Sequence, residues 1–152
     1  MTNQDLIEIA KEDIIRHEGY VREIYLDTEK LPTFGVGHLV TELDPEYTWP
    51  VGSPVTDERI LQAFHDDFMA ALDDAHWLFD NFNTHPLAVQ RVLVNMAFNL
   101  GRTRLGKFKN MIAAVNDKDY SRAADEMIDS RWYRQVGRRS KELVEMMKTA
   151  NG

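Results

Sequence analysis

Residues 17–39 read HEGYVREIYLDTEKLPTFGVGHL, and the chain changes within this stretch from helical to extended structure. The segment YVREIYL alternates apolar and polar residues, as a strand with one buried face does. The next residues, DTEKLP, have the composition of a turn, and TFGVGHLV is β-branched and rich in glycine. The stretch therefore predicts an antiparallel hairpin or small sheet across residues 20–40.

A helix is predicted before this sheet. Apolar residues recur at helical spacing from Leu6 to Ile15, and Thr2 or Asn3 can cap the start. Gly19 is a natural stop, because glycine takes the left-handed conformation that often ends a helix.

A long helix is predicted after the sheet. Residues 42–55 hold three prolines and a glycine, so we expect an irregular loop there. Thr56 is a strong N-cap, and apolar residues then keep helical spacing to about Asn81.

The second half of the chain is predicted to be helical throughout. LAVQRVLVNMAFNLG, after Pro86, is apolar on nearly every side and is expected to be the buried central helix. Shorter amphipathic helices follow at about 107–116, 119–130 and 138–149.

These elements predict an α+β fold with two lobes: a small antiparallel sheet lobe joined by a long helix to an all-helical lobe. We expect one domain over residues 1–152. Its parts are a sheet lobe at about 12–58, a connecting helix at 57–81, and a helical lobe from 82–152 with the N-terminal helix.

Composition excludes several classes of function. The 152 residues contain no cysteine, so disulfides, thiolate zinc sites and cysteine nucleophiles are absent. The net charge of -7 argues against a nucleic-acid or anionic-membrane binder, although RTRLGKFK and RWYRQVGRR concentrate basic residues late in the chain. The N-terminal segment has neither the pattern of a signal peptide nor that of a membrane anchor, so we expect a product made in the cytoplasm.

Two carboxylates in the opening stretch are candidates for acid–base chemistry. Glu18 falls at the end of the first helix, where the helix dipole disfavours an ionised carboxylate, as suits a general acid. Asp27 lies in a turn, where a carboxylate is partly solvated and stays ionised. The hydroxyl of Thr33, on the returning strand, can hold a water molecule that Asp27 deprotonates. A structural interpretation competes, since turn aspartates cap their own backbone, and the spacing alone leaves both interpretations open.

The full stretch resembles the catalytic segment of the phage-type lysozymes of glycoside hydrolase family 24, the T-even phage endolysins. The matching segments are Glu18-Gly19, IYLDTE at 24–29 and TFGVGHL at 33–39. NMAFNLG at 95–101 and SRWYRQ at 130–135 resemble two further family blocks, in the same order. The resemblance covers about residues 10–149 and implies a two-lobed lysozyme fold.

The resemblance also implies a function and a set of site residues. The function is hydrolysis of the β-1,4 bond between N-acetylmuramic acid and N-acetylglucosamine in peptidoglycan, without a cofactor, leading to host cell lysis. Glu18 is then the general acid, Asp27 its partner, and Thr33 the residue that positions water in an inverting reaction. Leu39 and Phe98 match positions that line the sugar cleft.

Further residues follow from the same resemblance. Arg139 matches an arginine that pairs with the catalytic glutamate, and the motif around His38 implies a structural ion pair. The chain departs from the family at two polar cleft positions, a serine and an asparagine, which are Met111 and Glu126 here. These departures leave the catalytic segment intact.

Other side chains have simpler interpretations. His65, Asp66 and Asp67, and Asp73, Asp74 and His76, invite a metal site, but their spacing favours a solvated helix face. Trp132 and Tyr133 can stack on sugar, although a place in the core is the expectation for a late helix.

Three functions remain open on the sequence. The first is a hydrolytic muramidase acting as an endolysin. The second is a lytic transglycosylase, which needs an acid but no aspartate to activate water. The third is a catalytically silent wall-binding or virion module. For the endolysin we expect a monomer that binds peptidoglycan, has no membrane anchor, and reaches the periplasmic wall through a phage holin.

Overall fold

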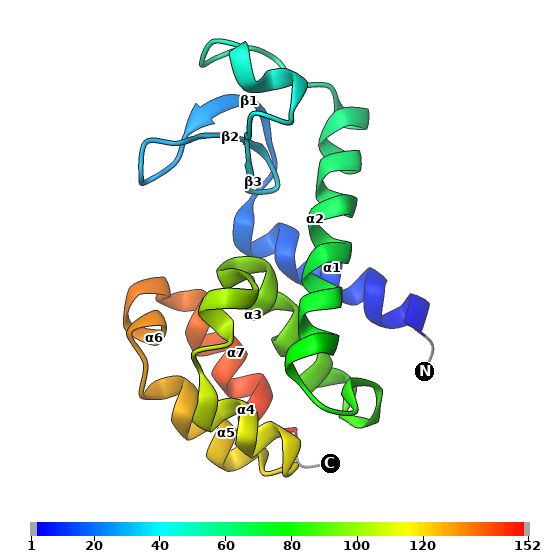
Figure 1. Cartoon of the computed structure of the whole chain (residues 1–152), viewed down its shortest axis with the longest axis vertical. Helices are drawn as coiled ribbons and strands as arrows, with labels where there is room; N and C mark the ends of the chain where they lie inside the picture. Colours follow the sequence, from blue (N-terminus) through cyan, green and yellow to red (C-terminus); the bar gives the residue numbers. More distant parts are fainter. Residues whose placement is uncertain (1–2, 151–152) are drawn as a thin grey trace. The chain divides into compact units, whose positions relative to one another are not determined.

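The computed structural model describes residues 3–150 and contains helices and a small sheet in the order shown in Figure 1. The helices are α1 (Asn3–Glu18), α2 (Asp57–Leu78), α3 (Leu87–Leu105), α4 (Lys109–Asn116), α5 (Tyr120–Ile128), α6 (Arg131–Val136) and α7 (Arg138–Lys148). The strands are β1 (Val21–Leu26), β2 (Pro32–Gly35) and β3 (His38–Leu39), and two 3-10 turns are η1 (Pro45–Thr48) and η2 (Phe82–Thr84). The predicted α+β class is confirmed.

The chain forms two compact units. The sheet unit is Lys11–Met69, and the helical unit contains the described residues up to Ala10 together with those from Ala70 onward. The divisions fall within α1 and within α2. The division into a sheet lobe, a connecting helix and a helical lobe stays a prediction.

The end of α1 follows the glycine stop that the sequence predicts. Gly19 has a φ of 86°, and its N–H donates to the carbonyl of Ile15 at 2.8 Å. This left-handed residue closes the last turn and redirects the chain into β1. The first helical residue is Asn3, whereas the alternative cap, Thr2, lies outside the described residues.

The three strands form an antiparallel sheet in the order β1-β2-β3. The outer edge of β1 is covered by the last part of the loop at 42–55, since Gly52 and Ser53 exchange backbone hydrogen bonds with Ile24 at 2.8 and 3.0 Å. Val55 donates to the carbonyl of Arg22 at 2.9 Å, which continues this pairing. Backbone groups on this edge of β1, which a hairpin alone would leave unpaired, are therefore hydrogen-bonded.

The loop at 42–55 is more ordered than its prolines suggested. It contains the 3-10 turn η1, and Glu46 within that turn is 2% exposed. The guanidinium group of Arg59, on α2, donates to Glu46 at 2.8 and 3.0 Å and to Asp44 at 3.0 Å. These charge-assisted bonds fasten the loop to α2, which a pattern of turn residues does not reveal.

The start of α2 follows the predicted cap. The N–H of Arg59 donates to the hydroxyl of Thr56 at 3.2 Å, and the helix runs to Leu78, three residues short of the predicted end. Asn81 then takes a left-handed conformation with a φ of 51°, which is incompatible with continuing the helix.

In the helical unit, α3 is the buried helix that its composition predicts. Its residues from Val92 to Ala97 are all buried, and the helix is kinked at Gly101, where φ is 79°. Helices α4, α5 and α7 follow near their predicted positions. Helix α6 was not predicted as a separate helix. Ser130 is its N-cap, and the Ser130 hydroxyl accepts from the N–H of Tyr133.

Candidate active site

Glu18 is the last residue of α1, and its side chain is half-buried in the sheet unit. The helix ends there because Gly19 is left-handed, so the carboxyl group lies where α1 meets the sheet. A Cβ built on Gly37, in the turn between β2 and β3, would lie 2.7 Å from Glu18 Oε1. The glutamate carboxyl group is thus in close contact with that turn.

Asp27 shapes the turn between β1 and β2. Its Oδ1 accepts from the N–H groups of Glu29 and Leu31 at 2.8 and 2.9 Å, and its backbone bonds Leu31 and Lys30. Lys30 is left-handed with a φ of 65°. Asp27 therefore has the structural role predicted for a turn aspartate, but this role occupies only one of its two carboxylate oxygens. Oδ2 has no hydrogen-bond partner among residues 3–150, and it is available to a ligand or water.

Thr33 lies in the middle of a row across the sheet. It pairs with Tyr25 on β1 and with Leu39 on β3, and directly paired residues of antiparallel strands point to the same face. Its hydroxyl donates to the carbonyl of Leu31 at 3.0 Å. Because that proton is committed, the oxygen of Thr33 can accept a hydrogen bond from water.

Tyr25 is a member of the site that the sequence analysis did not single out. Burial raises the pKa of its phenol, and the negative charges of Glu18 and Asp27 raise it further. The phenol is therefore within electrostatic reach of both carboxylates. Two signals were in the sequence: Tyr25 stands two residues before Asp27, on the same side of an alternating strand, and the resemblance includes it.

On the opposite face of the sheet, Phe34 and His38 make contacts that stabilise the fold. Phe34 pairs with His38, their rings are 4.9 Å apart, and Phe34 is fully buried. His38 bonds two carboxylates: its Nδ1 lies 2.7 Å from Asp67 and its Nε2 lies 2.9 Å from Asp44. Because successive residues alternate between faces, His38 and Thr33 lie on opposite sides of the sheet.

The remaining predicted site residues are divided between the units. Leu39, in the sheet unit, is 45% exposed beside Thr33. Phe98 is half-buried on α3, and Arg139 is buried at the start of α7, both in the helical unit. The Nε of Arg139 donates to Asn95 Oδ1 at 2.8 Å. The roles assigned to these residues stay predictions.

Among the other aromatic and acidic candidates, Trp132, Asp67 and Asp74 have structural partners. Trp132 is buried, and its indole N–H donates to Asn99 at 2.7 Å, as expected of a core residue. No cluster of three metal-ligating side chains occurs within residues 3–150. Instead, Asp67 binds His38 and Asp74 binds Arg102 at 2.8 Å.

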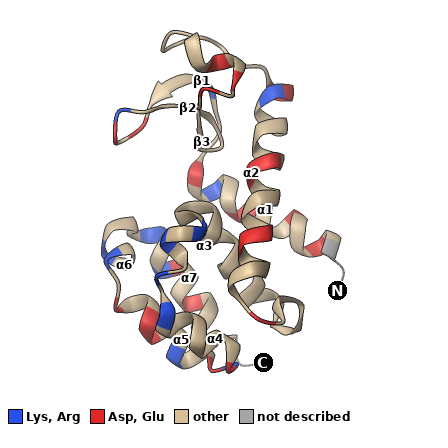
Figure 2. Cartoon of the chain, in the orientation of Figure 1, with Lys and Arg blue, Asp and Glu red and all other residues tan. Residues whose placement is uncertain are grey.

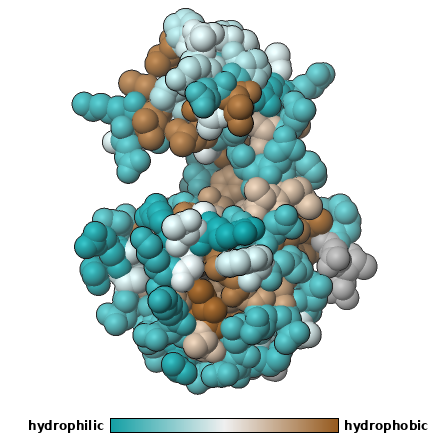
Figure 3. Space-filling model, viewed as in Figure 1, coloured by the Kyte–Doolittle hydropathy of each residue, from teal (hydrophilic) through white to brown (hydrophobic). Residues whose placement is uncertain are grey.

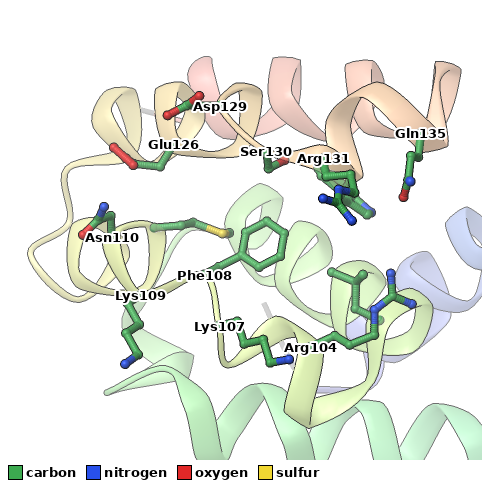
Figure 4. A pocket seen from close by; sticks show the side chains of 13 residues that line it. Arg104, Lys107, Phe108, Lys109, Asn110, Glu126, Asp129, Ser130, Arg131 and Gln135 are labelled. Carbon is green, nitrogen blue, oxygen red and sulfur yellow. The ribbon is translucent and has the colours of Figure 1, made fainter.

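A cavity of about 440 Å³ lies in the helical unit, and Figure 4 shows its lining. Both positions at which the chain departs from the resembled family, Met111 and Glu126, line it. Four basic side chains and two acidic ones surround the cavity: Arg104, Lys107, Lys109, Arg131, Glu126 and Asp129. Because cations outnumber carboxylates, the cavity favours an anionic ligand group.

The charge distribution of the helical unit agrees with that cavity. Figure 2 shows blue, basic segments near the end of α3 and around α6, whereas acidic segments are frequent along α2. Figure 3 shows brown, apolar patches on the surface of the sheet unit, where the exposed hydrophobic residues include Leu26, Leu31 and Leu39. None of the helices within residues 3–150 has the length and apolar character needed to span a membrane.

The family model described as phage lysozyme matches residues 15–149, which include the whole of the sheet site. The chain therefore belongs to the phage lysozyme family. It is accordingly a glycoside hydrolase of the lysozyme class, acting on peptidoglycan.

Similar proteins occur both as free-standing lysozymes and within larger phage proteins. The chain is 26% identical to probable T4-type lysozyme 2 of Dictyostelium discoideum, over 95% of this chain and 96% of that protein. It is 29% identical to the peptidoglycan hydrolase gp36 of Pseudomonas phage phiKMV, over 97% of this chain but 16% of the relative. It is 28% identical to the pre-baseplate central spike protein Gp5 of Enterobacteria phage T4, over 98% of this chain and 28% of the relative.

Proposed function

We propose that this protein is a muramidase that hydrolyses the β-1,4 bond between N-acetylmuramic acid and N-acetylglucosamine, with Glu18, Asp27 and Thr33 as its catalytic residues. The observation that supports the proposal is the sheet face on which Thr33 lies beside Tyr25. The phenol of Tyr25 is within electrostatic reach of the carboxylates of Glu18 and Asp27. Two carboxyl groups in unlike settings are what acid–base cleavage of a glycosidic bond requires.

Glu18 acts as the general acid in this mechanism. It protonates the glycosidic oxygen as the bond to the leaving sugar breaks, so the leaving group departs as a neutral alcohol. Its half-buried carboxyl group lies at the end of α1, against the turn between β2 and β3.

Asp27 and Thr33 act on the attacking water. The turn amides hold Asp27 through Oδ1, which leaves Oδ2 to take a proton from water. The hydroxyl oxygen of Thr33 accepts a hydrogen bond from the other O–H of that water, since the Thr33 proton is donated to the Leu31 carbonyl. Attack by a water held in this way, from the side opposite the leaving group, inverts the configuration of the anomeric carbon.

Other residues bind the substrate or support the acid. Leu39 offers an exposed apolar side chain beside Thr33, and Phe98 offers a half-buried ring on α3. The family resemblance implies for Arg139 the role of an arginine that supports the general acid. Peptidoglycan is anionic, and the basic cavity of the helical unit is suited to its carboxylates.

The biological role is that of an endolysin that lyses the bacterial host. The protein is made in the host cytoplasm, acts as a monomer, and reaches the periplasmic wall when a holin opens the inner membrane. The likeness to the spike protein Gp5 supports a second role, that of a lysozyme module carried on a virion. Copurification with phage particles, compared with recovery from the lysate, distinguishes these two roles.

The experiment that tests the proposal compares three variants on purified peptidoglycan. Glu18→Gln and Asp27→Asn each lose about 10²–10⁴-fold in kcat, because each removes a proton-transfer group. Glu29→Gln is the control: Glu29 is an exposed acid in the same turn, and it keeps the parent rate. The readouts are reducing ends and the anomeric form of the first product.

Three results contradict the proposal in different ways. Full activity of Asp27→Asn refutes the two-carboxylate mechanism. Products with anhydro-sugar ends identify a lytic transglycosylase. Wall binding without release of reducing ends by the parent protein identifies a silent binding module.

A further inference from the structure

Gly37 lies closer to the Glu18 carboxyl group than any residue with a side chain could. A Cβ built on it would lie 2.7 Å from Oε1 and 3.1 Å from Cδ of Glu18. Real Cβ atoms essentially never approach another heavy atom within 3.0 Å. Any other residue here therefore requires the Glu18 carboxyl group, or the turn itself, to move.

The turn also needs glycine for a second reason, which must be separated from the first. Gly37 has a φ of 64°, a left-handed conformation that residues with a Cβ rarely adopt. This backbone strain would lower the stability of the fold, and it does not depend on Glu18. The contact with the carboxyl group, in contrast, would change the position of Glu18.

We propose that Gly37 is a positioning residue: its missing Cβ creates the space in which the Glu18 carboxyl group lies against the β2–β3 turn. The catalytic part of this inference rests on the proposed role of Glu18 as general acid. Gly37 touches the acid and not the reacting atoms, so it acts through Glu18.

The chain supplies two matched controls for backbone strain. Gly35 has the same φ of 64°, and a Cβ on it would lie 2.7 Å from Ile60 Cγ2, so its substitution combines strain with overlap away from Glu18. Gly52 has a φ of 93°, and a Cβ on it would meet only Glu23 Oε2, at 4.0 Å. Its substitution adds strain without overlap.

The first measurement is the steady-state kinetics of Gly37→Ala, Gly35→Ala and Gly52→Ala, expressed per folded molecule. Gly37→Ala loses about 100-fold in kcat with little change in KM, because a displacement of about 1 Å at a catalytic group has that effect. Both controls keep the kcat of the parent, although their melting temperatures fall.

The second measurement does not use turnover. Each glycine is replaced by alanine in the parent and in Glu18→Ala, and the fall in Tm is compared between the two backgrounds. The fall caused by Gly37→Ala is smaller by about 2–4 °C when Glu18 is absent, because the overlap has been removed. The falls caused by Gly35→Ala and Gly52→Ala are the same in both backgrounds.

The proposal requires both results, and the absence of either overturns it. If Gly37→Ala lowers kcat but lowers Tm equally in both backgrounds, backbone strain alone causes the loss of activity. If the two falls in Tm differ but kcat is unchanged, the contact between Gly37 and Glu18 does not contribute to catalysis. If Gly37→Ala does not fold, Gly37→Asn replaces it, since asparagine tolerates a positive φ but keeps the Cβ. If Glu18→Gln is fully active, the proposed general acid fails, whereas the Tm cycle still decides whether Gly37 positions Glu18.

Discussion

The two compact units each contain a histidine whose ring nitrogens are both hydrogen-bonded, but the pKa values of the two histidines are shifted in opposite directions. In the sheet unit, both ring nitrogens of His38 face carboxylates, those of Asp67 and Asp44. In the helical unit, His85 Nδ1 lies 2.7 Å from the hydroxyl of Tyr120, and Nε2 lies 3.1 Å from the carbonyl of Asp80.

The partners decide the sign of each pKa shift. Burial by itself lowers the pKa of His38, but the hydrogen bonds and charges of Asp67 and Asp44 outweigh it, so the pKa is raised. Burial lowers the pKa of His85; the Asp80 carbonyl opposes this, the charge of Lys118 adds to it, and the pKa remains lowered. Burial disfavours the charged form of both histidines, and the carboxylate partners of His38 reverse that preference.

The comparison extends to how each unit is held together. The sheet unit has short strands, and Arg59 fastens the loop at 42–55 through the buried Glu46 and through Asp44. The helical unit relies on the buried apolar face of α3, which includes Leu93. We therefore expect ionic bonds to contribute a larger share of the stability in the sheet unit than in the helical unit.

Arg59→Met tests that statement with the largest expected effect. It leaves the buried carboxylate of Glu46 without its charge partner and destabilises the protein by about 3–5 kcal/mol, measured by urea unfolding. Arg102→Met is the matched control in the helical unit, since Arg102 is 46% exposed in its pair with Asp74. It costs about 1 kcal/mol or less. Equal costs for the two variants would remove the distinction between the units.

Leu93→Ala tests the apolar side of the comparison. Leu93 is fully buried on α3, and its truncation costs about 2–5 kcal/mol through lost burial and the cavity left behind. Because no titratable group is involved, this cost is the same at every pH between about 5.5 and 8.5. A cost that varied with pH in this window would contradict the assignment of α3 to an apolar core.

His38→Gln tests the histidine whose pKa is raised. Its pKa is raised in the folded state, so the stabilisation that it contributes is complete below its ordinary value of 6.5 and is lost as the pH rises through the folded pKa. The difference in unfolding free energy between the parent and His38→Gln is therefore largest in mild acid and declines toward alkaline pH. A difference that grows with pH would show that His38 is neutral in the fold.

His85→Gln has the smallest expected effect and the opposite sign. The lowered pKa means that the unfolded chain takes up the proton first, so the contribution of His85 is present above 6.5 and is lost as the pH falls toward the folded pKa. The stability difference between the parent and His85→Gln therefore declines on acidification. If the stability difference for His85→Gln changed with pH in the same direction as that for His38→Gln, the opposite pKa shifts of the two histidines would be refuted.

Much of the fold was predictable from local signals. Gly19 ends α1, Thr56 caps α2, and the apolar composition of α3 marks it as buried. Each of these features depends on residues close together in sequence. The short helix α6 was missed because its six residues are too few to show a helical period.

The candidate active-site segment was predicted less completely. The sequence indicated Glu18, Asp27 and Thr33, while the row that joins Thr33 to Tyr25 and Leu39 depends on strand register. Register follows from the geometry of the turns, which residue types only suggest. Likewise, the ionic bonds of Arg59 join residues 13 and 15 positions apart, with no periodicity to indicate them.

The sequence by itself determined the order of helices and strands, the candidate catalytic residues and the resemblance to phage lysozymes, because all three are encoded in short contiguous patterns. Only the tertiary structure decided that one oxygen of Asp27 is used by its own turn, that His38 faces away from Thr33, and that Gly37 lies against the carboxyl group of Glu18. These contacts are set by close packing at distances of a few ångströms, and residue types alone do not specify packing at that precision.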